Sequence, residues 1–316
     1  MENVENLIEK EIQKGGFPGA VVGVFNSKEV LYQDSFGFAQ LKPHKRVMTR
    51  ETIFDLASLT KVTATTISIM HLIENGKLNL YDYISSYFPE ATNDKRDITV
   101  FHLLTHTSGF QAIIQLWNEV MPYQEKIKYI LSLPLQYEVG KKVIYSDPNY
   151  ILLGELIKRV SGLSLDEYAR KNIFRPLNME STDFNPLDNI TADKDRYAAT
   201  EICKWRDECV VGEVHDKNSY YNGGVCGHAG LFSTINDLII FCQMILKSPL
   251  REQILSPYTI DLMTKNWTEE LNNNRGLGWD LIGNFRSSGG IYFSQRAFGH
   301  TGFTGTSIWL DPELEL

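Results

Sequence analysis

The pattern of apolar and polar residues in the N-terminal region predicts a helix followed by two strands. Apolar residues recur at helical spacing from Val4 to Ile12, and Gly15-Gly16 ends that run. Two short runs rich in β-formers follow at residues 19–25 and 29–33, with Asn26-Ser-Lys28 between them as a hairpin turn.

The middle of the chain has the 3.6-residue period of helices, and its end returns to strand character. A long apolar face begins at Ser58, and Asn75-Gly76 supplies its stop signal. Thr234 followed by Asp237 is typical of a helix start. Helices are predicted over residues 58 to about 80, 99–104, 149–160 and 238–246, and strands over 298–302 and 307–310.

This order of elements predicts the α/β (α+β) class, with one antiparallel sheet built from both chain ends and flanked by helices. A mostly helical lobe would be inserted between the strands. We find no repeat or linker, so residues 1–316 are expected to form a single domain. Its sheet lobe would span about 1–56 and 276–316, and its helical lobe about 57–275.

Composition narrows the possible partners. Hydrophobic residues make up 43 % of the 316 residues, and the net charge is −8. No stretch combines lysine and arginine with aromatics, which argues against a nucleic-acid partner. The N-terminus lacks the basic start and apolar core of a signal peptide, and no apolar run could span a bilayer. We therefore expect a cytoplasmic protein with a small-molecule substrate and no membrane contact.

The segment Leu56-Ala-Ser-Leu-Thr-Lys61 is the first candidate for chemistry. Ser58 directly precedes a helical pattern, and Lys61 lies one turn further on the same face. Unpaired N–H groups and the positive dipole end of the helix favour an alkoxide at Ser58 and an oxyanion beside it. Taken alone, the pair is more simply interpreted as a helix N-cap and a solvated lysine.

Two further motifs change that balance. Tyr145-Ser-Asp147 precedes an amphipathic helix, and His300-Thr-Gly302 lies in the C-terminal strand region. With Ser58-x-x-Lys61, this order resembles the penicillin-recognising serine hydrolases, which include class C β-lactamases, D-alanyl-D-alanine peptidases and related esterases. Segments 103–109, 145–154 and 230–234 also resemble family segments, and the likeness runs from about residue 19 to the end.

The resemblance implies a role for each motif. Ser58 would attack a carbonyl, and Tyr145 would pass the proton to the leaving group. Lys61 would be the base if its pKa were lowered, or would keep its charge and support Tyr145 as phenolate. The backbone N–H groups of Ser58 and Phe303 would form the oxyanion hole. Substrate would lie along the strand that carries His300, Thr301 and Gly302, with Gly302 small to admit it.

Two residues depart from the family pattern. Asp147 replaces the asparagine of Y-x-N, and a carboxylate cannot donate a hydrogen bond to a substrate carbonyl. Asp147 would also favour the charged form of Lys61, which shifts the role of base toward Tyr145. His300 replaces the lysine of K-T-G, so the permanent cation of that motif is lost. This variant resembles the esterases and D-amino-acid amidases of the family.

We therefore predict a serine hydrolase that forms an acyl-enzyme at Ser58 and hydrolyses an ester, amide or D-peptide bond without metal or organic cofactor. The alternatives are a true β-lactamase or D-alanyl-D-alanine carboxypeptidase, and a catalytically silent binding protein of the same fold. A substrate cleft is expected between the helical lobe and the sheet, and Tyr220 and Tyr221 are candidates for lining it. Histidines at 215 and 228 beside three cysteines raise a zinc alternative, but the C-x-H spacing favours loop histidines bonded to backbone.

The last residues, Glu313 to Leu316, have the alternation of a strand. In the resembling family a strand at this point lies inside the sheet beside the first N-terminal strand. We therefore expect the natural protein to continue for roughly 30 to 60 residues, enough for a strand and a helix.

Overall fold

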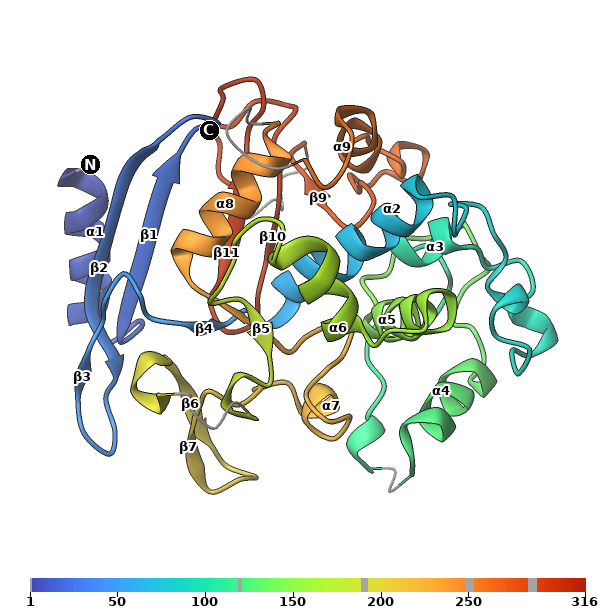
Figure 1. Ribbon diagram of the computed structural model, residues 1–316, viewed down its shortest axis with the longest axis horizontal. Helices are drawn as coiled ribbons and strands as arrows, with labels where there is room; N and C mark the ends of the chain where they lie inside the picture. The colour runs from blue at the N-terminus through green and yellow to red at the C-terminus, as the bar shows by residue number, and fades with distance from the viewer. Residues whose placement is uncertain (1, 119–120, 189–192, 248–252, 284–288) are drawn as a thin grey trace.

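The computed structural model describes residues 2–118, 121–188, 193–247, 253–283 and 289–316. Strands gather near both ends of the chain, and most helices lie between them (Figure 1). The helices are α1 (Glu2–Gln13), α2 (Ile67–Glu74), α3 (Val100–Leu104), α4 (Tyr123–Ser132), α5 (Asp147–Ser161), α6 (Leu165–Ala169), α7 (Lys217–Tyr220), α8 (Ile235–Ile245) and α9 (Pro257–Met263). The strands are β1 (Gly19–Phe25), β2 (Val30–Gln40), β3 (Arg46–Val47), β4 (Phe54–Asp55), β5 (Asp183–Phe184), β6 (Ala199–Cys203), β7 (Glu208–Val211), β8 (Leu231–Ser233), β9 (Asp280–Leu281), β10 (Phe298–Thr301) and β11 (Ser307–Leu310).

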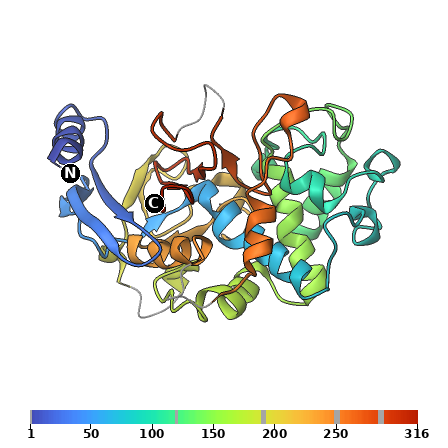
Figure 2. The same cartoon turned by 90° about the horizontal axis from the view of Figure 1, so that it is seen from above.

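The N-terminal strands form the predicted hairpin. β1 and β2 are antiparallel with Ala20 opposite Phe36, and Asn26 N–H donates to the carbonyl of Glu29 in the turn. β2 continues well past the predicted residue 33 and pairs with β3. Helix α1 lies against this sheet at one end of the molecule (Figures 1 and 2).

The fold class is confirmed, but the strands of the two chain ends lie in separate sheets. β9, β10 and β11 form their own antiparallel sheet, with His300 opposite Ile308. Within the described residues β1 pairs only with β2, and β11 only with β10. A groove of about 610 Å³ separates the two facing edges, and residues of β1, Trp309 and Leu316 line it. No described strand connects the sheets across this groove.

The helical lobe is built around α5. Ten consecutive residues of α5, from Pro148 to Ile157, are buried, and α2, α3 and α6 surround it (Figures 1 and 2). The predicted helix that begins at Ser58 ends at Glu74 rather than near residue 80. Asn75 and Gly76 end it because Gly76 adopts a φ of 65°, which disfavours other residues.

The range predicted for the mostly helical lobe also contains strands. Four strands, β5 to β8, lie within the range 57–275, and β8 pairs with both β4 and β5. Helix α8 lies in that range too, yet it packs on the N-terminal sheet. A Cβ at Gly23 of β1 would meet Ile239 of α8 at 3.0 Å. None of the described helices is both long enough and apolar enough to cross a membrane.

Candidate active site

Ser58 lies in a tight turn that follows β4 directly. The turn is a 3-10 helix, η1 (Ala57–Leu59), and a π-helical stretch, η2 (Lys61–Thr66), leads from it into α2. Ala57 adopts a φ of 45°, the left-handed region that L residues rarely occupy. Ser58 is half-buried, whereas its neighbours Ala57 and Leu59 are buried. The predicted placement of Ser58 in the first turn of a helical segment is confirmed.

The Lys61 side chain is fully buried, and its ammonium group has three partners. Its Nζ donates to Ser58 Oγ at 3.0 Å and to the carbonyl oxygen of His228 at 3.1 Å. It also forms an ion pair with Asp147 Oδ1 at 2.9 Å. An ammonium group has three N–H donors, so every donor of a charged Lys61 has an acceptor.

This environment holds Lys61 in its charged form. Burial alone would lower the pKa of Lys61, but its interactions with Tyr145 and Asp147 outweigh burial and raise the pKa above its ordinary value. Of the two roles that the sequence left open, the structure therefore favours the one in which Lys61 remains a cation.

Two cations lie close to the Tyr145 ring. Lys61 Nζ is 4.8 Å from the ring centroid, and the guanidinium carbon of Arg275 is 5.4 Å from it. The rings of His106 and His300 have their centroids 4.7 Å and 5.7 Å from that of Tyr145. The structure thus brings Tyr145 together with Lys61 and His300, as the sequence predicted.

His300 is a neutral imidazole in this site. Burial, together with the charges of Arg275 and Lys61, lowers the pKa of His300 to about 3. Nδ1 of the ring is 2.8 Å from the carbonyl oxygen of Thr301 and must donate to it, which leaves Nε2 as an acceptor. His300 therefore cannot replace the lysine of K-T-G as a cation.

Arg275 supplies a cation beside Tyr145 instead, and sequence analysis missed it. Its side chain is only 15 % exposed, and its nearest carboxylate, Asp280 Oδ1, is 3.9 Å from Nη2. Its Nη1 is buried without a hydrogen-bond partner. The segment around Arg275 has no spacing or motif that would have singled it out.

The turn after His300-Thr-Gly302 is fastened to the segment that carries Ser58. The hydroxyl of Thr304 donates to the carbonyl of Asp55 at 2.6 Å, and that of Thr306 to the carbonyl of Leu56 at 3.1 Å. A Cβ at Gly302 would collide with the Leu56 carbonyl and the Thr306 hydroxyl. Gly302 is therefore needed for this close approach, a reason that differs from the predicted space for substrate.

Phe303 projects from this turn, with 83 % of its surface exposed. Among the described residues its backbone N–H donates to no carbonyl, as the predicted oxyanion hole requires. The ring of His215 stacks on the Phe303 ring at 5.5 Å between centroids. Thr301, which precedes Gly302, is exposed at the end of β10.

His228 is buried and forms an ion pair with the half-buried Asp216, which differs from the predicted bonding to backbone. Its Nε2 is 2.8 Å from Asp216 Oδ1, and Asp216 also accepts from Ser219 N–H. The interaction with Asp216 outweighs burial and raises the pKa of His228 well above its usual range. Within the part of the chain that the structure describes, no group of three His, Cys, Asp or Glu residues could hold a metal ion.

Tyr220 and Tyr221, the predicted cleft residues, belong to a separate aromatic cluster. Their rings lie 5.3 Å and 5.7 Å from that of Trp205, and the guanidinium of Arg206 lies 4.0 Å from the Tyr220 ring. Both tyrosines are exposed, at 39 % and 48 %. No contact that we observe joins either of them to Ser58, Lys61 or Tyr145.

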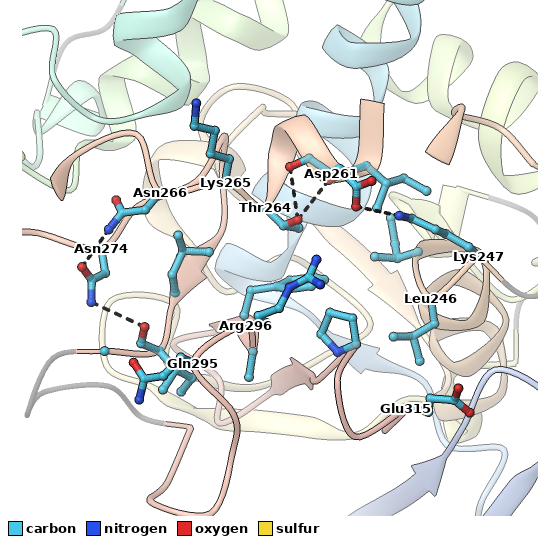
Figure 3. Close-up of a pocket in the computed structure, with 18 of the residues that line it drawn as sticks. Leu246, Lys247, Asp261, Thr264, Lys265, Asn266, Asn274, Gln295, Arg296 and Glu315 are labelled. Carbon is cyan, nitrogen blue, oxygen red and sulfur yellow. Dashed lines mark hydrogen bonds and ion pairs between the residues drawn. The ribbon is translucent and has the colours of Figure 1, made fainter. Parts of the chain in front are cut away.

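A second cavity, of about 910 Å³, lies away from these groups. Figure 3 shows its polar lining, with Asp261 paired with Lys247 at 2.6 Å and Arg296 projecting between the walls. None of the residues predicted for catalysis or substrate binding lines this cavity.

Comparisons with known proteins identify the family of this chain. The Beta-lactamase family model matches residues 4–316. The chain is 33 % identical to the Bacillus subtilis (strain 168) protein named "N-acetylmuramyl-L-alanine amidase", over 100 % of this chain and 79 % of that one. It is 33 % identical to the Escherichia coli (strain K12) protein named "Putative D-alanyl-D-alanine carboxypeptidase", over 99 % of this chain and 79 % of that one.

Solved structures of the same fold are also similar. "EstCE1, a hydrolase with promiscuous acyltransferase activity" superimposes with a TM-score of 0.83 at 22 % identity, covering 99 % of this chain and 91 % of that one. The octameric penicillin-binding protein homologue from Pyrococcus abyssi gives a TM-score of 0.77 at 25 % identity, covering 99 % and 71 % of the two chains. The chain therefore belongs to the beta-lactamase family and, with it, to the serine hydrolases.

Proposed function

We propose that this protein hydrolyses ester or amide bonds through an acyl-enzyme at Ser58. The observation that carries the proposal is the position of Lys61, whose Nζ lies 3.0 Å from Ser58 Oγ and 2.9 Å from Asp147 Oδ1. A buried cation that donates to the serine hydroxyl stabilises negative charge as that oxygen loses its proton. An ordinary helix cap needs no such partner.

The chemistry divides into two steps. Ser58 Oγ attacks the carbonyl carbon, its proton passes to Tyr145, which enters the step as a phenolate, and the N–H groups of Ser58 and Phe303 receive the oxyanion. Tyr145 then gives the proton to the departing alcohol or amine. In the second step Tyr145, now deprotonated, takes a proton from a water molecule as that water attacks the acyl carbon, and gives this proton to Ser58 Oγ as the acyl–oxygen bond breaks. Lys61 stays charged throughout and lies beside both oxygens.

The relatives' names favour amides of cell-wall peptides as substrates. One relative is named for a muramyl-alanine amide bond and another for a D-alanyl-D-alanine peptide bond. We therefore propose a peptidoglycan-type amide or D-peptide as the substrate class, with simple esters as poorer acyl donors. Because Asp147 replaces a donor amide and His300 is neutral, turnover of β-lactams is the less favoured alternative.

A fluorophosphonate probe tests the proposed nucleophile. The wild-type protein should be labelled on the peptide that contains Ser58, whereas Ser58→Ala should remain unlabelled. Hydrolysis of p-nitrophenyl esters, muramyl-alanine amides, D-alanyl-D-alanine peptides and nitrocefin would then rank the substrates. A folded wild-type protein that is neither labelled nor active on any of these would instead be the catalytically silent binding protein.

A further inference from the structure

Asp55 is a buried carboxylate one residue away from the active-site turn, and the proposed mechanism does not use it. It ends β4, and only 2 % of its surface is exposed. Its two oxygens have separate partners. Oδ1 accepts from Ala57 N–H at 2.8 Å, and Oδ2 accepts from His215 N–H at 2.7 Å.

The first of these bonds holds a strained residue. Ala57 has a φ of 45°, and its N–H points back to Asp55 Oδ1 rather than into a helix or sheet. A left-handed conformation costs an L residue free energy, so it persists only where surrounding bonds impose it. The conformation of Ala57 sets the direction of the next residue, which is Ser58.

The second bond connects the segment that carries Ser58 to His215, whose ring packs on Phe303. His215, whose N–H Asp55 binds, stacks its ring on Phe303 at 5.5 Å. The backbone carbonyl of Asp55 accepts from Thr304, the residue after Phe303. Asp55 thus contacts the segment of the nucleophile, the turn that contains Phe303 through Thr304, and the residue that stacks on Phe303, His215.

We propose that Asp55 is a positioning residue of the active site. Its carboxylate holds Ala57 in the left-handed conformation and fixes the loop that contains His215. As a result, Ser58 Oγ and the Phe303 N–H remain aligned for acyl transfer. This inference rests on the proposed function, because it assigns Asp55 a role in acylation at Ser58. Asp55 acts through backbone groups and does not touch the substrate.

The geometry requires the ionised form of Asp55. A carboxylate can accept both N–H bonds, whereas a protonated carboxyl group presents a hydrogen to one of the two N–H donors. Burial raises the pKa of Asp55 to about 6, although the two N–H bonds oppose that change. The titratable groups that face it are the His215 side chain, which favours the carboxylate, and Asp216, which disfavours it.

The kinetic consequence is an acid limb in the pH profile, which means that kcat falls at low pH. Below about pH 6 the Asp55 carboxyl gains a proton and loses one of its two bonds, so kcat should fall while KM changes little. Asp55→Asn imitates the protonated form at every pH. It should therefore reduce kcat roughly 10- to 100-fold at pH 8, as expected for a displaced nucleophile, and the acid limb should disappear.

A matched control removes a carboxylate of the same kind elsewhere. Asp237 is also buried, accepts from Ser181 N–H and the Thr182 hydroxyl at 2.8 Å each, and has a pKa raised by burial. Asp237→Asn should leave kcat and its pH profile as in the wild type. An equal loss of kcat in both variants would overturn the proposal, because it would reflect stability alone.

Two further variants keep the test decisive if Asp55→Asn does not fold. Ala57→Gly removes the strain that Asp55 is proposed to hold, so it should retain more of its kcat at pH 5 than the wild type does. His215→Gln keeps the backbone N–H, so the acid limb should remain but move to higher pH, because the His215 side chain no longer favours the carboxylate. An unchanged limb in Ala57→Gly, or its loss in His215→Gln, would overturn the proposal.

The assay also separates this inference from the function on which it rests. All variants are measured with one neutral p-nitrophenyl ester and with fluorophosphonate labelling of Ser58. If wild-type Ser58 were not labelled at all, the proposed function would fail. If it were labelled, and Asp55→Asn were labelled at the same rate, the role of Asp55 would fail and the function would stand.

Discussion

Replacement of Asp147 by asparagine tests the charge state on which the proposed chemistry depends. Asp147 is the first residue of α5, and its Oδ1 lies 2.9 Å from Lys61 Nζ. The Lys61 side chain is completely buried, whereas that of Asp147 is 17 % exposed. Asp147→Asn removes the negative charge but keeps an oxygen that can accept one hydrogen bond from Lys61.

The expected loss of stability in Asp147→Asn follows from the distance between the Lys61 and Asp147 charges. Unit charges 2.9 Å apart attract by about 6 kcal/mol at an effective dielectric constant of about 20. Ser58 Oγ and the His228 carbonyl still accept from Lys61 in the variant, so part of that energy remains. We expect a fall of about 3 kcal/mol in the free energy of unfolding, at the lower end for a broken buried pair. Tm should fall by roughly 5 °C.

The pH dependence of the stability difference between wild type and variant is set by the direction in which the pKa of Lys61 is shifted. Because the folded-state pKa of Lys61 is raised above that of an unfolded lysine, its contribution is fully present below about pH 10. That contribution is lost as the pH rises through the folded-state pKa. Denaturant unfolding at several pH values should therefore show a constant gap between wild type and variant near neutrality, and a smaller gap above about pH 10.5.

A surface carboxylate provides the control. Asp183 pairs with Arg170 at 2.6 Å, but both side chains are more than a third exposed, at 37 % and 36 %. Asp183→Asn should cost less than about 1 kcal/mol.

Asp147→Asn should also capture penicillins better, because its amide supplies a donor, with little change on small esters. Equal stability of Asp147→Asn and wild type at pH 7 would refute the claim that this pair holds Lys61 charged.

Three other substitutions have defined outcomes. Ser58→Ala should reduce acyl transfer at least ~10³-fold without loss of fold, and mass spectrometry after a slow substrate should find wild-type adducts on Ser58 and on no other serine. Arg275→Gln should raise the pKa of His300, since the Arg275 charge helps to lower it, and NMR titration of the imidazole would measure this; an unchanged pKa would show that burial acts alone. Gly302→Ala should abolish activity by forcing the strand away from Ser58, whereas Gly305→Ala, with nothing within 4 Å of its new Cβ, should cost only backbone strain; equal kinetics in the two alanine variants would contradict the packing argument.

Local patterns predicted what lies close together in the sequence. The helix that begins near Ser58 and the strand at residues 307–310 follow from periodicity. Thr234 caps α8 by accepting from Asp237 N–H, as its position before the apolar run predicted. The length of the first of these segments was overestimated, because the apolar residues after Gly76 lie in a turn rather than in α2.

The supporting contacts of the site could not be predicted in this way. Lys61 and the His228 carbonyl are 167 residues apart, and Asp55 and His215 are 160 apart. No spacing rule connects residues at such separations, since the fold alone brings them together. Arg275 is a similar case, because its position beside Tyr145 depends on how the segment before β9 packs on α5.

The charges of the site explain why a neutral histidine can occupy the position of the family's lysine. Lys61 and Arg275 both lie close to the Tyr145 ring, and both lower the pKa of His300. A third cation at position 300 would be opposed by two existing ones in a buried setting, where like charges repel strongly. Asp147 balances one of these cations, which leaves Arg275 with only a distant carboxylate. We therefore expect Lys61 and Arg275, rather than a charged His300, to offset the negative charge that develops in the tetrahedral intermediate.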